Sequence, residues 1–75
     1  MAERKNLIRA REMKGCSKND VAKYLGVTLR YIDMIEQGLR TPSLLLALKL
    51  EVLYGMPVGY LFPELRLKAT GTEEN

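Results

Sequence analysis

The chain has 75 residues, of which 47% are hydrophobic and 28% charged, and its formal net charge is +3. This length suits one small domain and the composition is near the globular average, so a second domain and general disorder are both excluded. The sequence contains no histidine and one cysteine. That composition excludes Cys/His zinc clusters and histidine-based catalysis. We therefore expect a protein that is not an enzyme and needs no cofactor, metal or small-molecule ligand.

The charge is unevenly spread. Residues 1–40 carry nine Lys/Arg against five Asp/Glu, a net +4, whereas residues 41–75 carry three against four, a net −1. A basic half suits contact with a polyanion, although it is equally an ordinary way of staying soluble. The longest apolar run, residues 44–48, is far below the roughly 20 residues of a membrane span, and the N-terminus lacks a signal peptide's apolar stretch. We expect a cytoplasmic protein without membrane contact.

Apolar periodicity and end signals predict five helices, taken here in chain order. The first covers residues 3–14 and precedes Gly15, which favours a left-handed C-cap. The second starts after Ser17, which pairs with Asp20 as a capping box, and stops at Gly26. The third starts after Thr28 and closes at Gly38, with Ile32 and Ile35 pointing inward.

The fourth helix is predicted for residues 44–54, between Ser43 and Gly55, and the fifth for residues 57–62, which begin with a proline. Residues 64–75 lose the helical pattern, so we expect a domain of residues 1–63 and a flexible C-terminal tail. Leu65 and Leu67 either pack on the domain or a partner, or are incidental. The predicted fold is all-α, and no strand pattern is present.

The second and third helices are short and only a few residues apart, which is typical of a helix-turn-helix. Gly26 permits the tight backbone turn between them, and Ala22 allows the two helices to approach closely. Apolar residues supply the contact between the helices: Val21, Leu25, Val27, Ile32 and Ile35.

The segment GCSKNDVAKYLGVTLRYIDMIEQG, followed by TPSL and PVGYLF, resembles the Cro/CI-type (XRE) family of helix-turn-helix regulators from phages and bacteria. The resemblance covers roughly residues 7–62. It implies a compact, five-helix, lambda-repressor-like domain with the helix-turn-helix at its second and third helices. It also implies a sequence-specific transcriptional regulator, acting as a repressor. Such a protein binds an inverted-repeat operator in double-stranded DNA as a homodimer, with its recognition helix in the major groove.

The resemblance assigns DNA contacts to particular residues. It places the base-reading positions at Leu29, Arg30, Asp33 and Met34, and the phosphate contacts at Lys18, Tyr31, Arg40 and Thr41. Arg30 can donate two hydrogen bonds to guanine, and Asp33 can accept one from cytosine or orient Arg30. The alternatives are that the arginines are merely solvated and that Tyr31, like Tyr24, is half buried where helices pack.

Other positions carry expected structural roles. The resemblance pairs Arg11 with Glu36 as a bridge between the first and third helices, and puts Cys16 in a core position. In the fourth and fifth helices, Leu45, Val52 and Tyr60 stand where the family tends to have polar residues. We expect these three to border a two-fold dimer interface, the alternative being an enlarged core.

Two rival functions stay open. Leu29 and Met34 give the recognition helix an apolar character, which favours a protein-interaction module built on the same scaffold. The second rival is a DNA-binding antitoxin that uses the fourth helix or the tail to bind its toxin. Both rivals require a protein partner. Salt dependence separates a DNA-binding protein from an interaction module, because phosphate contacts weaken steeply as salt rises.

Overall fold

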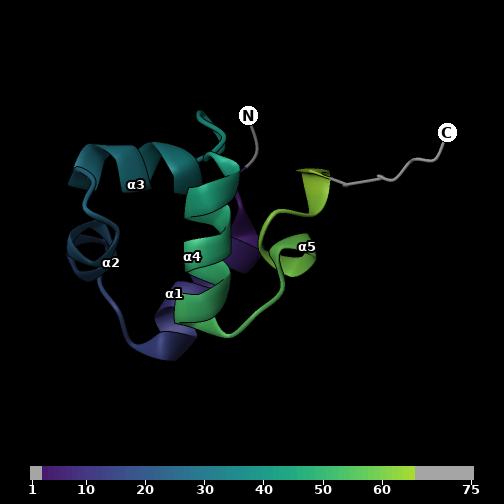
Figure 1. Cartoon of the computed structure of the whole chain (residues 1–75), viewed down its shortest axis with the longest axis horizontal. Helices are drawn as coiled ribbons and strands as arrows, with labels where there is room; N and C mark the ends of the chain where they lie inside the picture. Colours follow the sequence, from purple (N-terminus) through teal and green to yellow (C-terminus); the bar gives the residue numbers. More distant parts are fainter. Residues whose placement is uncertain (1–2, 66–75) are drawn as a thin grey trace, which may run out of the picture.

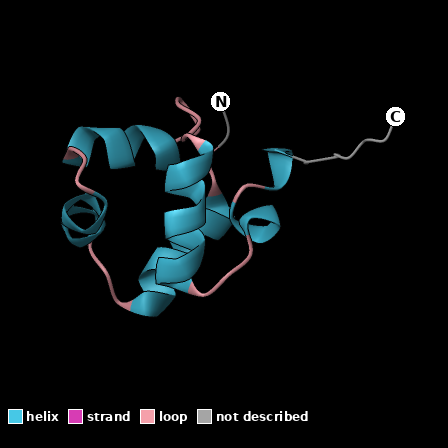
Figure 2. Ribbon diagram, viewed as in Figure 1, coloured by secondary structure: helices cyan, strands magenta, loops and turns pink. Residues whose placement is uncertain are grey.

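The computed structural model describes residues 3–65, and this part of the chain is helical without strands (Figure 2). The helices are α1 (Lys5–Lys14), α2 (Lys18–Leu25), α3 (Leu29–Glu36), α4 (Leu44–Tyr54) and α5 (Val58–Leu61). A 3₁₀ helix, η1 (Pro63–Leu65), follows. The predicted all-α fold with five helices is confirmed.

The helices surround a central pair formed by α1 and α4. Figure 1 shows α2 and α3 on one side of this pair and α5 on the other. α1 contacts α3, α4 and α5, while α2 packs mainly on α3. This arrangement leaves the α2–α3 unit on the outside of the molecule, where one face of α3 is free of the core.

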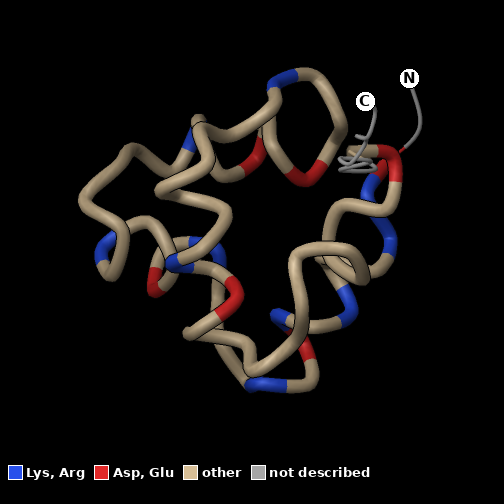
Figure 3. Tube along the Cα trace, turned by 45° about the vertical axis from the view of Figure 1, so that its right-hand side comes forward, with Lys and Arg blue, Asp and Glu red and all other residues tan. Residues whose placement is uncertain are grey.

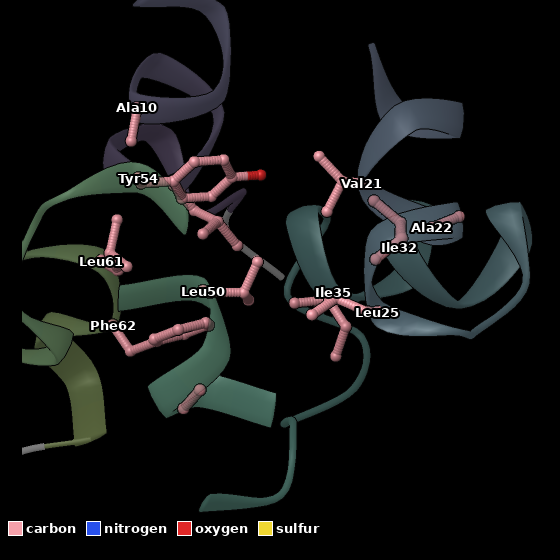
Figure 4. Close-up of a cluster of buried hydrophobic side chains, with 12 residues drawn as sticks. Ala10, Val21, Ala22, Leu25, Ile32, Ile35, Leu50, Tyr54, Leu61 and Phe62 are labelled. Carbon is pink, nitrogen blue, oxygen red and sulfur yellow. The ribbon is translucent and has the colours of Figure 1, made fainter. Parts of the chain in front are cut away.

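A single core joins these elements. Figure 4 shows apolar side chains of α2 and α3 facing those of α4 and α5 across a common interior. Ile32 and Ile35 of α3 are buried as predicted, and so are Val21, Ala22 and Leu25 of α2. The other members of the core are Leu7, Ala10, Ala47, Leu50, Tyr54, Leu61 and Phe62. Val27 and Cys16 are only partly buried against it.

Local hydrogen bonds fix where the helices begin. The Ser17 hydroxyl accepts from the Asp20 amide at 3.0 Å, and the Asp20 carboxylate accepts from the Ser17 amide at 3.0 Å, so the predicted capping box is present. The hydroxyls of Thr28 and Ser43 accept from the amides of Tyr31 and Leu46 in the same way. α2, α3 and α4 therefore start where the sequence predicted a cap.

Three helices, α1, α3 and α5, differ from expectation at their ends. α1 begins at Lys5 rather than residue 3, because Arg4 is its N-cap residue and uses its side chain elsewhere. α3 ends at Glu36, two residues before Gly38, and α5 spans Val58–Leu61 with Pro57 as its N-cap residue. Helical structure also continues past residue 63, since Leu65 of η1 packs against the core. The rest of the expected tail, including Leu67, lies outside the described residues.

Candidate nucleic-acid interface

The turn between α2 and α3 gives the unit its shape. Gly26 caps α2 with φ of 71°, a left-handed conformation that residues with side chains avoid. The amide of Val27 donates to the carbonyl of Ala22 at 3.0 Å, which closes the turn. Ala22 is 3% exposed at the packed face of α2, where a small side chain lets the two helices approach. The predicted helix-turn-helix geometry is thus formed.

The outer face of α3 is built by the same periodicity that buries its inner face. Because Ile32 and Ile35 point into the core, Leu29 and Arg30 are exposed, and Asp33 is half-buried on the adjacent face. Leu29 retains 49% of its surface exposure. Met34 is also half-buried. The four expected base-reading residues therefore lie along α3, and Arg30 and Asp33 are the two charged groups among them.

Lys18 and Asp33 form an ion pair that links the start of α2 to the middle of α3. The Lys18 Nζ donates to Asp33 Oδ1 at 2.6 Å, and each side chain keeps 40% of its exposure. The Lys18 ammonium holds the pKa of the Asp33 carboxyl below its ordinary value, assisted by the nearby charge of Arg30. The sequence analysis expected Asp33 to accept from cytosine or to orient Arg30, and it did not predict the ion pair with Lys18.

The loop after α3 carries the other expected phosphate contacts. Arg40 and Thr41 are both exposed, and the Arg40 guanidinium lies 5.8 Å from the centre of the Tyr31 ring, a cation–π contact. Tyr31 itself is half-buried and packs against the core. Tyr24, by contrast, is 53% exposed, so it does not occupy a helix packing surface.

Arg4 binds backbone carbonyls at the end of α3 and in the loop after it, a role that the sequence analysis missed. Its Nη1 donates to the carbonyl of Ile35 at 2.6 Å and to the carbonyl of Arg40 at 2.7 Å. Its Nε donates to Glu64 at 2.6 Å, and the guanidinium lies 5.2 Å from the Phe62 ring centre. The one local signal was a basic residue at a helix N-terminus, where the helix dipole disfavours it.

A sequence model described as "Helix-turn-helix" matches residues 7–61, which is more than half of the chain. The chain belongs to the Cro/CI-type (XRE) helix-turn-helix family. No curated protein matches the sequence. This family consists of DNA-binding regulators, and a DNA-binding, transcription-regulating role follows for this member.

The expected bridge of this XRE-family domain is present. Arg11 Nε donates to Glu36 Oε2 at 2.6 Å and Arg11 Nη2 to Glu36 Oε1 at 3.2 Å, a two-pronged pair between α1 and α3. Arg11 also donates to the carbonyl of Cys16 at 3.0 Å. Burial raises the pKa of the neighbouring Tyr54 hydroxyl, and the charge of Glu36 adds to this shift. The pair therefore anchors the end of α3 inside the fold.

The α4 surface is more apolar than the XRE-family resemblance alone implied. Leu45 is 62% exposed and Val52 is 75% exposed, so neither completes an enlarged core. Leu44 and Leu48, which the sequence analysis did not single out, are exposed on the same helix. Tyr60 differs from its two expected companions, because it is half-buried and packs against the core.

Basic and acidic residues are mixed along the described part of the chain. Figure 3 shows Lys and Arg interspersed with Asp and Glu along the trace. Among residues 3–65, no three potential metal-ligating side chains gather into a cluster. Within the same described range, no helix has the length and apolar character to cross a membrane.

Proposed function

We propose that this protein is a sequence-specific transcriptional regulator, acting as a repressor, that binds an inverted-repeat operator as a homodimer with α3 in the major groove. The exposed face of α3 carries the proposal. It presents Arg30 toward solvent, while Lys18 contacts Asp33 in the middle of α3 and Arg40 lies over the Tyr31 ring in its first turn. A base-reading group flanked by two cations is suited to a groove lined by phosphates.

The roles of individual residues follow from their chemistry. Arg30 donates two hydrogen bonds to guanine O6 and N7, and Leu29 or Met34 contacts a thymine methyl group. Lys18, Arg40, Thr41 and the Tyr31 hydroxyl bind phosphate oxygens and set the orientation of α3. Arg4 supports this surface because it holds the backbone carbonyl of Arg40 in place.

Two copies paired through the apolar face of α4 read two half-sites. Their recognition helices enter successive major grooves about 34 Å apart, so a two-fold protein reads an inverted repeat. Occupancy of such a site within a promoter excludes the polymerase by steric overlap, which is the simplest route to repression.

Selection from a pool of random duplexes at physiological salt tests this function. The expected result is enrichment of an inverted repeat with half-sites about one helical turn apart. Retention of duplexes without a common sequence would reject sequence-specific recognition. Enrichment of a single half-site would support base recognition by α3 and reject the dimeric operator.

Alanine variants separate base reading from phosphate binding. Arg30→Ala should weaken binding to the selected site by about 1 to 3 kcal/mol and relax one base position. Lys18→Ala should also weaken binding to the selected site, through the loss of a phosphate contact and not of a base contact. Fluorescence anisotropy titrations on both duplexes give the comparison. Equal losses on both duplexes for Arg30→Ala contradict its role as a base reader.

A protein-interaction module is the second candidate, and exposed leucines on and after α3 favour it. Leu29 and Leu39 both keep about half of their surface exposure. Binding of DNA through six to ten phosphates should weaken by about 10³ to 10⁵ between 50 and 200 mM salt, whereas an apolar protein interface responds far less. Absence of that salt response, with a second polypeptide co-purifying, favours the interaction module or the antitoxin.

A further inference from the structure

The ion pair between Lys18 and Asp33 joins an expected phosphate contact to an expected base-reading residue. The two residues are 15 positions apart, and their 2.6 Å contact forms only because α2 and α3 pack at the helix-turn-helix. The Asp33 carboxylate therefore binds the Lys18 ammonium group, which the proposed function assigns to a DNA phosphate. This salt bridge couples a phosphate-binding residue to a base-reading residue.

The pair is exposed enough to exchange partners. Each side chain retains 40% of its exposure, so water and salt screen the attraction. Both residues border an open depression whose other walls include Glu3, Glu36 and Gln37. Among these wall residues the cation is Lys18, which is paired with Asp33, while the Glu36 carboxylate is held by Arg11. A DNA phosphate approaching Lys18 therefore meets a partly neutralised site.

Two base edges of the major groove carry a donor for Asp33: adenine N6, which stands beside the N7 acceptor, and cytosine N4, the usual partner of an aspartate. Its carboxylate only accepts hydrogen bonds, and cytosine presents the N4 amino donor, whereas guanine presents acceptors. Opposite cytosine, the carboxylate exchanges Lys18 for the base, and Lys18 is released to a phosphate. Opposite guanine, the carboxylate faces the acceptor atoms O6 and N7, which repel it, and it stays bound to Lys18.

We infer that Asp33 is a specificity-determining residue, which withholds Lys18 from DNA of random sequence and releases it at sites that present cytosine to α3. The inference rests on the proposed DNA-binding function and deepens it. It assigns the carboxylate a favourable role at the matching site and an unfavourable one at other sites. The discrimination arises from the coupling between Asp33 and Lys18.

A double-mutant cycle measures that coupling. Asp33→Asn should raise affinity for random duplex roughly fivefold, since removal of an exposed ion-pair partner changes free energy by up to about 1 kcal/mol. It should also steepen the slope of log affinity against log salt by about 0.9, the value for one added phosphate contact. Affinity for a selected site with cytosine should not rise, so the ratio of specific to random binding should fall.

The same substitution in a Lys18→Met background isolates the coupled part of the effect. There, Asp33→Asn should change affinity for random duplex less than about twofold, because no ammonium remains to be released. Glu12→Gln is the matched control, because it removes the same charge from an exposed position on α1. Its effect should be below about twofold in both backgrounds, which separates Asp33 from a change in net charge.

A measurement without DNA checks the pair itself. The Asp33 carboxyl pKa, followed by NMR, should rise when Lys18 is replaced by Met, because the ammonium is the main cause of its lowered pKa. An unchanged pKa overturns the inference at its first step. Equal effects of Asp33→Asn with and without Lys18, in a protein that binds DNA, overturn the inference alone. Absence of salt-sensitive DNA binding by the unsubstituted protein overturns the proposed function as well.

Discussion

At the scale of single residues, two aspartates are held in their charged form by neighbours in the fold. Backbone and side-chain hydrogen bonds with Ser17 lower the pKa of Asp20, and the hydrogen bond from Lys18 lowers that of Asp33. A carboxyl whose folded-state pKa is depressed stabilises the fold above its unfolded pKa. That stabilisation is lost as the pH falls through the folded pKa.

We therefore expect the free energy of unfolding to decrease below about pH 4, the range of an ordinary aspartate. Asp20→Asn should flatten this decrease because it removes one of the two carboxyl groups whose pKa the fold lowers. Urea unfolding at about pH 5 and about pH 2.5 measures the difference. Glu12→Gln, which replaces an exposed carboxyl on α1, is the matched variant to be measured beside it. Equal pH dependence for Asp20→Asn would contradict the capping role of this carboxylate.

Which residue contacts could be predicted depended on the sequence separation of the partners. Ser17 and Asp20 are three residues apart, so a short motif specifies their two hydrogen bonds. The Arg11–Glu36 pair spans 25 residues and was predicted only through the family resemblance. Arg4 reaches partners 31 to 60 residues away, and no local pattern specifies such contacts. The Lys18–Asp33 pair was missed for the same reason.

At the scale of elements, the turn between α2 and α3 depends on backbone conformation rather than on space. Gly26 has φ of 71°, and a Cβ placed there meets nothing within 4 Å. Gly26→Ala should therefore destabilise the protein by about 1 to 2 kcal/mol, the cost of a left-handed residue with a side chain. Crowding adds nothing to that cost.

Gly59 within α5 provides the matched control. A Cβ there also meets nothing within 4 Å, but its backbone lies outside the left-handed region. Gly59→Ala should stabilise the protein by about 0.4 to 1 kcal/mol, because alanine restricts the unfolded chain. Thermal unfolding of the two variants compares them directly. Destabilisation by both substitutions would show that packing, and not the conformation of Gly26, decides the result.

Helix positions were predicted well because their signals are local. Apolar spacing and capping hydroxyls placed α2 and α4, whereas the start of α1 was two residues early. Periodicity was less informative about which faces are buried. Met13 follows the apolar spacing of α1 yet is 68% exposed, and α4 is apolar on its exposed as well as its buried side. For such a helix, tertiary packing selects the buried face.

At the scale of the whole molecule, α4 has an apolar face that the other described residues, 3–65, leave uncovered. Leu44, Leu45, Leu48 and Val52 are all exposed along this helix. Exposed apolar area of this kind on a small domain marks an association surface. A second copy is the occupant required by the proposed inverted-repeat operator, because a two-fold interface presents the same face from both chains.

Val52→Glu tests that association without disturbing the core. Because Val52 is 75% exposed in the single chain, a carboxylate there remains solvated in the monomer and the fold should persist. In a two-fold interface the same carboxylate is desolvated and faces its own copy, so the dimer should dissociate to monomers in sedimentation velocity runs. Met13→Glu, at a similarly exposed apolar position on α1, should leave the dimer intact.

Two measurements on Val52→Glu decide whether the α4 face is the dimer interface. Helical circular dichroism of Val52→Glu equal to that of the unsubstituted protein, together with loss of the dimer, assigns the α4 face to self-association. Operator affinity should then fall while the half-site preference is kept, because each monomer retains its own α3. A folded Val52→Glu variant that sediments like the unsubstituted protein would exclude this face from the dimer. Symmetric operator recognition would then require contact through another surface.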